Sequence, residues 1–303
     1  MAKEHKGRSA RLLAFILALI MVASVLAYSF RNPSKPELRE VKFDMGEDWR
    51  SWLEYIPNTT GYVVYFDYTE ENDTLRSYIY NRTAHYIYNV SQNPYLFRDF
   101  RPSIAFFSRM MITDLYNCLI DVNRSKVYFA YKHKDTYKNF TMKVGRVARW
   151  LYAMVDEVHP VILANPLYAM KIIDLMDNGT DCFLKDYGNY TSRINGSFSY
   201  TFLLAGESAK RTLTDNGTPI ADFYFEGYRM NGSIYEKVVG MHFIGYYYFV
   251  KTNETLNRTT YYYYKNYDDG FSLAIMGSKN FTDLTRLTPE IRTIIVKFNQ
   301  TET

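Results

Sequence analysis

Cysteine is scarce in this chain of 303 residues, which contains only Cys118 and Cys182. No Cys-X-X-Cys pair occurs, so neither a thioredoxin-like site nor a zinc ribbon is supported. In an exported chain, an even number of cysteines is typical of disulfide pairing. We therefore predict a Cys118–Cys182 disulfide between the end of a helix and a later loop, with two free buried thiols as the alternative.

Sequence motifs of catalysis are also missing. The chain has no His-Glu-x-x-His, no Gly-x-Ser-x-Gly and no phosphate-binding glycine loop. Asp156 and His159 lie three residues apart, a spacing that permits metal ligation from one helix face. The favoured alternative is that His159 lies at the end of a helix and interacts with the carbonyl groups there. We predict no catalytic, metal-binding or cofactor-binding residue and no cofactor, and we favour binding over catalysis.

Net charge is low outside the first few residues. The formal charge of the chain is +4, and residues 1–11 account for +3 of it through Lys3, Lys6, Arg8 and Arg11 against Glu4. The remaining +1 gives no electrostatic reason to expect nucleic-acid binding.

Long apolar runs are absent after residue 30, so the sequence predicts at most one membrane crossing. Residues 12–30 hold no charged residue, and a helix of that length spans roughly the 30 Å bilayer core. The basic head at 1–11 favours a cytoplasmic N-terminus. We expect a signal anchor at 12–30, a stalk at 31–46 and an extracellular domain at 47–303. Val25-Leu26-Ala27 is also an acceptable cleavage pattern, and cleavage there predicts a secreted protein.

The first half of the domain reads as mainly helical. Residues 62–66 predict a strand, and residues 69–88 a helix. Apolar residues at spacings of three and four predict a helix from Pro102 to about residue 118 and another over 142–158, with a short strand at 126–131 between them. A third helix begins after Asn165-Pro166 and stops at Asn178-Gly179.

The second half reads as strands. Asn231-Gly232 is the strongest hairpin signal in the chain. The expected strands are 197–204, 221–230, 233–241, 242–251, 259–265, 271–276 and 291–298. The sequence thus predicts an α+β fold in which a helical section covers one face of a C-terminal antiparallel sheet, with a possible subdivision near 178–195.

Asparagine occurs mostly in glycosylation sequons, in 15 of its 20 positions, whereas chance would give roughly three. This excess favours an exported glycoprotein. The predicted acceptors are Asn58, Asn72, Asn81, Asn89, Asn123, Asn139, Asn178, Asn189, Asn195, Asn216, Asn231, Asn253, Asn257, Asn280 and Asn299.

Two intervals, 90–122 and 140–177, lack sequons and contain the three predicted helices. Either these helices form the core, or part of their surface is kept bare for a partner. A polar surface without glycans is the alternative reading of the sequons themselves.

Tyrosine is abundant, with 30 residues. Strand alternation sends Tyr261 and Tyr263 to one face and Tyr262 and Tyr264 to the other. An exposed row could stack on sugars or on another protein, whereas tyrosines covered on both faces would be core.

Together these patterns predict a membrane-anchored surface glycoprotein whose external domain binds or scaffolds, with a protein or glycan partner. An extracytoplasmic hydrolase and an accessory subunit that docks through the sequon-free helices are the competing hypotheses.

Overall fold

The computed structural model describes residues 41–42, 48–91, 102–110, 116–122, 128–147 and 150–293. All the described residues belong to one compact unit, within residues 41–303. Among them, no helix combines the length and the apolar character needed to cross a membrane. The expected head at 1–11, span at 12–30 and stalk at 31–40 lie outside the described residues.

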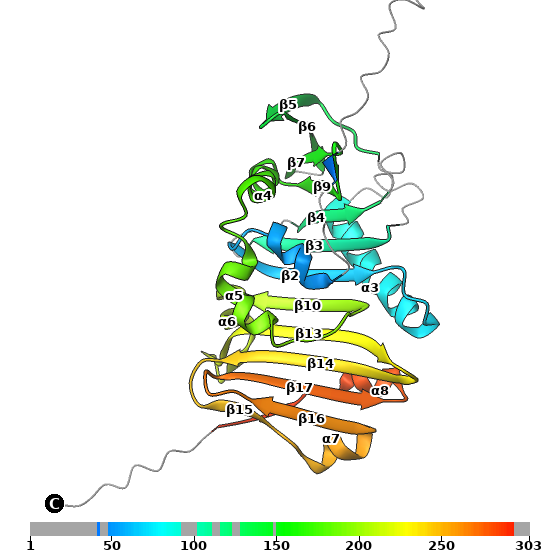
Figure 1. Ribbon diagram of the computed structural model, residues 1–303, viewed down its shortest axis with the longest axis vertical. Coiled ribbons are helices and arrows are strands. Elements are labelled where there is room, and N and C mark those ends of the chain that lie inside the picture. The colour runs from blue at the N-terminus through cyan, green and yellow to red at the C-terminus, as the bar shows by residue number, and fades with distance from the viewer. Residues whose placement is uncertain are drawn as a thin grey trace, which may run out of the picture. The chain divides into compact units, whose positions relative to one another are not determined.

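One twelve-stranded sheet organises the described unit (Figure 1). All of its neighbouring strands pair antiparallel. From one edge to the other the strands are β16 (Tyr261–Asn266), β17 (Phe271–Ser278), β14 (Ile234–Phe243), β13 (Ala221–Asn231), β10 (Tyr200–Ala205), β2 (Thr60–Asp67), β3 (Ile104–Met110), β4 (Tyr116–Asp121), β9 (Val161–Ala164), β7 (Trp150–Val155), β6 (Phe140–Val147) and β5 (His133–Tyr137).

Smaller elements surround this sheet. The described residues also form three two-stranded sheets. These pair β1 (Val41–Lys42) with β8 (Val158–His159), β11 (Thr214–Asp215) with β12 (Thr218–Pro219), and β15 (Tyr247–Val250) with β18 (Glu290–Thr293). The described helices are α2 (Trp49–Trp52), η1 (Leu53–Tyr55), α3 (Asp73–Ser91), α4 (Pro166–Asn178), α5 (Phe183–Thr191), α6 (Glu207–Thr212), α7 (Asn253–Arg258) and α8 (Phe281–Arg286).

Both faces of the central strands are buried. Along β2, Val63 and Tyr65 join a core with residues of α2, α4 and α5, and we call this side the first face. Val64 and Phe66 join a core with residues of α3 and α8 on the opposite, second face. Towards β16, the second face is covered by α8 and by Phe249 of β15. A strand between two cores needs apolar residues at consecutive positions, so its sequence loses the two-residue alternation of a half-exposed strand.

This double burial explains why the helix expected from Pro102 is wrong. Residues 104–110 form β3, and residues 116–121 form β4. Ile104, Phe107 and Cys118 match a helical spacing, but Ala105 and Phe106 between them are also buried. The apolar run therefore feeds both cores, and periodicity does not separate such a strand from a buried helix.

The helix expected over 142–158 is also wrong, but double burial applies only to its second half: residues 152–155 are all buried, whereas Thr141 and Lys143 beside Met142 are only half-buried. The residues form β6, β7 and the start of β8, with Met142 and Val144 on the first face and Tyr152 and Met154 on the second. The strand expected at 126–131 is absent over its described part, residues 128–131.

Elements with local signals were predicted correctly. Asn165 caps α4 through its side chain, Pro166 occupies the first turn, and Gly179 ends the helix at φ 60°. Asn231-Gly232 joins β13 to β14, again with a positive glycine φ of 60°. The strand at 62–66 and the helix at 69–88 correspond to β2 and α3.

The expected architecture is therefore corrected. The described chain is one large antiparallel sheet with helices on both faces. Over these residues, the expected helical section followed by a C-terminal sheet is wrong. One sheet includes the strands on both sides of the region proposed for a subdivision, because β10 pairs with β2 on one side and with β13 on the other.

Candidate functional site

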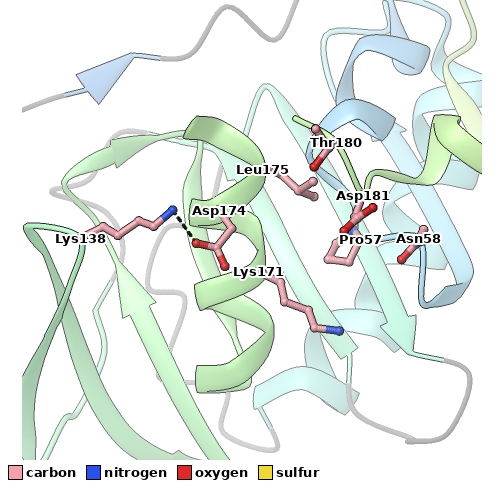
Figure 2. Close-up of a pocket in the computed structure, with 8 residues that line it drawn as sticks. All are labelled: Pro57, Asn58, Lys138, Lys171, Asp174, Leu175, Thr180 and Asp181. Atoms are coloured by element: carbon pink, nitrogen blue, oxygen red, sulfur yellow. Dashed lines mark ion pairs between the residues drawn. The ribbon is translucent and has the colours of Figure 1, made fainter. Parts of the chain in front are cut away.

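A pocket of about 380 Å³ opens beside α4 (Figure 2). It lies between this helix, the turn that joins β5 to β6, the loop before β2 and the loop between α4 and α5. Its lining combines two apolar residues with charged, amide and hydroxyl groups: Pro57, Asn58, Lys138, Lys171, Asp174, Leu175, Thr180 and Asp181. The volume falls within the range of small-molecule sites.

Buried hydrogen bonds hold α4 against the first face. The Tyr168 hydroxyl lies 2.7 Å from Thr60 Oγ1 on β2 and 2.8 Å from Ser108 Oγ on β3. At the start of the helix, the Asn165 backbone N–H donates to Asn117 Oδ1 at 2.9 Å. These bonds join the helix to three neighbouring strands, so the pocket is built on a rigid support.

The turn between β5 and β6 forms one wall and is tied to α4. Lys138 Nζ lies 2.7 Å from Asp174 Oδ1 and 3.1 Å from Asp177 Oδ2, and the Tyr137 hydroxyl donates to Asp174 Oδ1 at 2.8 Å. Partial burial acts to raise the pKa of Asp174, but the hydrogen bonds from Lys138 and Tyr137 outweigh it and lower the pKa. Figure 2 shows Lys138 reaching Asp174 from one side of the helix.

The opposite wall is fixed by backbone hydrogen bonds. The Asn58 N–H donates to the Asp181 carbonyl at 2.9 Å, and the Phe183 N–H donates to the Ile56 carbonyl at 2.7 Å. Pro57 and Cys182 form an isolated antiparallel bridge between them. Both walls are therefore connected to α4 or to the loop that follows it.

Lys171 differs from the other charged groups of the pocket. Asp174 is paired with Lys138, and Asp181 Oδ1 lies 2.8 Å from Lys185 Nζ. Lys171 forms no ion pair with any residue that the structure describes, and its side chain is exposed. An ammonium at the rim of a preformed pocket can bind an anion without first breaking an internal salt bridge.

A second group of titratable side chains surrounds His242. Its Nδ1 lies 2.5 Å from Asp222 Oδ1, and its Nε2 lies 3.0 Å from the Asp269 carbonyl oxygen. The Asp222 hydrogen bond is the main cause that raises the pKa of His242 above 6.5. Tyr190 stacks on the imidazole at 4.5 Å, and Arg193 binds the Asp269 carboxylate through two nitrogens. Both ring nitrogens are occupied, so the imidazole has no free atom for acid–base chemistry in this arrangement.

A third group joins β13 to β14 on the second face. The hydroxyls of Tyr224 and Tyr228 donate to Glu226 at 2.7 and 2.9 Å. Lys237 Nζ lies 3.2 Å from Glu226 and donates to the Leu287 carbonyl at 2.8 Å. Burial lowers the pKa of Lys237 despite the neighbouring carboxylate. The Glu226 carboxylate and the Lys237 ammonium are thus engaged by each other and by neighbouring residues.

The predicted disulfide is wrong, because both cysteines are free and buried. Cys118 faces the core of the second face. Cys182 immediately precedes Phe183, which packs into the core of the first face. Cys118 therefore points to the second face, whereas the segment that holds Cys182 packs against the first face. The sheet separates the two.

The weak metal hypothesis for Asp156 and His159 also finds no support. Asp156 pairs with Lys143, and His159 Nε2 lies 2.8 Å from Asp121. These residues lie at β7 and β8, so the interpretation of His159 at a helix end is wrong as well. Among the described residues, no group of three or more metal-ligating side chains occurs.

Most sequon asparagines with described side chains are exposed. Asn58 and Asn72 are half-buried, and Asn72 caps α3 through hydrogen bonds from Thr74 and Leu75. The exposed set is Asn81, Asn139, Asn189, Asn195, Asn216, Asn231, Asn253, Asn257 and Asn280. The side chains of Asn89, Asn123, Asn178 and Asn299 lie outside the description. Apart from the sequons, nothing in the described structure supports a glycoprotein, and their occupancy stays a prediction.

The sequon-free intervals do not form a bare helical surface. Their described parts are mainly strands of the central sheet, and α4 alone keeps the helical form expected there. The core interpretation therefore fits these strands, and the docking surface of three helices does not exist as expected.

The tyrosine run at the edge of the sheet alternates as predicted. Tyr262 is buried on the second face, while Tyr263 is 54% exposed and Tyr264 is 38% exposed. Tyr261 and Tyr263 pair with Gly277 and Ile275 of β17 on the first-face side. The row is thus partly core and partly surface.

Sequence reasoning missed the pocket residues. Lys138 and Asp174 meet only because the β5–β6 hairpin packs against α4, and neither residue belongs to a motif. The left-handed backbone of Lys138 and Asn139, with φ values of 46° and 67°, marks a tight turn. Lys-Asn is a weaker signal for such a turn than Asn-Gly.

Three comparisons place the chain among known proteins. The AF_2048_N family N-terminal domain matches residues 44–177, a range that holds most of the pocket. An uncharacterized protein of Archaeoglobus fulgidus is 36% identical over 314 residues, and the match covers 100% of this chain and 99% of that protein. A solved structure of TP0453, crystal form I, covers 74% of this chain and 90% of its own, with 11% identity and a TM-score of 0.39.

Proposed function

The chain belongs to the same family as the uncharacterized Archaeoglobus fulgidus protein, and we propose that its described unit is a binding domain whose ligand site is the pocket beside α4. The observation that carries the proposal is Lys171, an exposed ammonium without an ion-pair partner among the described residues, at the opening of a pocket with two fixed walls.

The other charged groups support binding over catalysis. His242 has both ring nitrogens engaged, and Glu226 and Lys237 bond to each other and to their neighbours. A general base or nucleophile needs a free atom within reach of the substrate. The pocket, by contrast, presents polar groups to a small guest.

The chemistry of the lining favours a small anion that carries hydroxyl groups. Lys171 would bind the anionic group, since an ammonium is a strong donor to phosphate or carboxylate oxygens. Asp181 accepts hydrogen bonds, and the Asn58 amide both donates and accepts them, so these two side chains suit hydroxyl groups. Leu175 and Pro57 provide an apolar surface for the carbon skeleton.

Calorimetric titration of the full-length chain tests this proposal with three probes. Glucose 6-phosphate has both features, inorganic phosphate has the anion alone, and glucose has the hydroxyl groups alone. We expect glucose 6-phosphate to bind most tightly of the three. Lys171→Met should weaken its binding by roughly tenfold, which corresponds to about 1.4 kcal/mol.

Lys279→Met is the matched control, because Lys279 is an exposed lysine at the turn before α8 and lines no part of the pocket. It should leave the affinity unchanged. Equal affinities for Lys171→Met and the wild type, or no saturable binding of any probe, would rule out this site. Turnover of glucose 6-phosphate during the titration would support the enzyme hypothesis instead.

A further inference from the structure

The central sheet has two open edges, β5 and β16. Each edge strand hydrogen-bonds to one neighbour in this sheet, so the other side of its backbone has no strand partner there. Such an edge is a template for a further strand. The two edges differ in the side chains that a second copy of the chain would meet.

Geometry restricts how two copies can extend one sheet. Two identical edges pair antiparallel around a twofold axis perpendicular to the sheet, and this rotation keeps each residue on its original face. Residues directly opposite one another must share a face. The axis therefore passes midway between one residue and its own copy, and the flanking residues meet in symmetric pairs.

Edge β5 opposes self-pairing in the registers centred on its first four residues. An axis at His133 sets Lys132 against Lys134, and an axis at Lys134 sets that lysine against its copy. An axis at Asp135 sets two aspartates opposite each other, and an axis at Thr136 sets Lys134 against Lys138. Like charges directly opposite are destabilising. Charged side chains on an edge are also a common way to prevent such pairing.

Edge β16 has a register free of this conflict. An axis at Tyr263 sets Tyr263 against its copy, Tyr262 against Tyr264 twice, and Tyr261 against Lys265 twice. Aromatic residues directly opposite one another are among the favourable cross-strand pairs, and this register sets no like charges against each other. Tyr263 and Tyr264 are 54% and 38% exposed in the single chain, so pairing would remove apolar surface from water.

Strand β16 is also fixed in position within the single chain by hydrogen bonds to β15. Tyr262 is buried, and its hydroxyl donates to the Val250 carbonyl at 3.1 Å. The Asn266 amide bonds to both the N–H and the carbonyl of Phe249, at 3.2 and 3.1 Å. Side chains at two positions along β16 thus fix it to β15, and little further order is lost on pairing.

From this asymmetry we propose that β16 is a self-association edge. Two copies of the chain pair antiparallel through β16, centred on Tyr263, and form one sheet that is continuous across both copies. Edge β5 stays free of such pairing because of its charges. This proposal is independent of the pocket beside α4, which lies at the other end of the strand order.

Sedimentation velocity of the full-length chain over a concentration series tests the proposal. The wild type should show a reversible monomer–dimer equilibrium. Tyr263→Lys sets two ammonium groups against each other on the axis and should raise the dimer dissociation constant at least tenfold, while Tyr263→Phe should keep it. Tyr246→Lys is the matched control, because Tyr246 is 67% exposed but lies outside β16.

A crosslink tests the register directly and does not depend on the charged variant. Residues that meet their own copy across a twofold axis lie close enough for a disulfide. Tyr263→Cys should give a covalent dimer under a mild oxidant, while Tyr246→Cys should not. A wild type that is monomeric at every concentration, a dimer that Tyr263→Lys leaves intact, or the absence of the Tyr263→Cys crosslink would overturn the proposal.

Discussion

His242 and Asp222 form the closest histidine–carboxylate pair among the described residues, with 2.5 Å between Nδ1 and Oδ1. The pair joins β14 to β13. The groups that face the imidazole are the Asp222 carboxylate, the Asp269 carbonyl and the Tyr190 ring, with Arg193 held at Asp269. Acceptors at both nitrogens favour the doubly protonated ring.

This arrangement predicts a pH-dependent stability. The folded pKa of His242 is raised above its unfolded value of 6.5, first by the Asp222 hydrogen bond. The stabilisation is therefore complete below about pH 6.5 and is lost as the pH rises through the folded pKa. Urea unfolding of the wild type and His242→Gln should give a stability difference that shrinks from pH 6 to pH 9. A difference that is constant over this range would contradict the assignment.

The turn between β5 and β6 gives a second prediction. Asn139 has a φ of 67°, a conformation that is costly for β-branched residues. Asn139→Val should lower the free energy of unfolding by about 1–2 kcal/mol, whereas Asn139→Gly should be neutral or slightly stabilising. Chemical denaturation measures both changes. Equal stabilities of the two variants would contradict the left-handed conformation of Asn139.

The buried Lys237–Glu226 pair gives a third prediction. The Lys237 side chain is 3% exposed and that of Glu226 is 18% exposed. Lys237→Met leaves a poorly solvated carboxylate without its cation and should cost about 3 kcal/mol. The double variant Lys237→Met/Glu226→Gln should recover part of this loss, since no unpaired charge remains. If the two single effects simply add in the double variant, the residues are not coupled.

The free cysteines can be counted chemically. Titration of the denatured, unreduced chain with a thiol reagent should find two thiols, and the folded chain should react slowly because both sulfurs are buried. Burial also raises the pKa of the Cys118 thiol and reduces its thiolate fraction. A count of zero thiols would restore the disulfide that the sequence suggested.

Local chemistry explains which elements were predictable. The start and stop of α4 are set by Asn165, Pro166 and Gly179, residues whose backbone and capping preferences act within a few positions. The Asn231-Gly232 turn is equally local. Strands β3 and β7 depend instead on being covered on both faces, and nothing near residue 104 or residue 150 indicates which segments will cover them.

The pocket depends on contacts between distant parts of the chain. The Asn58 N–H meets the Asp181 carbonyl only because the segment before β2 pairs with the loop after α4. Lys171 could not be predicted as a site residue, because sequence alone does not distinguish it from any other lysine on a helix surface. Strand alternation at Tyr262 and Tyr263, by contrast, followed from sequence alone.

Hydrogen–deuterium exchange of the full-length chain with and without saturating glucose 6-phosphate tests the ligand site most directly. The account predicts slower exchange at the backbone of Asn58, in the second half of α4 and at Thr180–Asp181, with no such change at β16. Loss of this protection in Lys171→Met, but not in Lys279→Met, would complete the result. Protection elsewhere in the sheet, or none at these segments, would contradict the account.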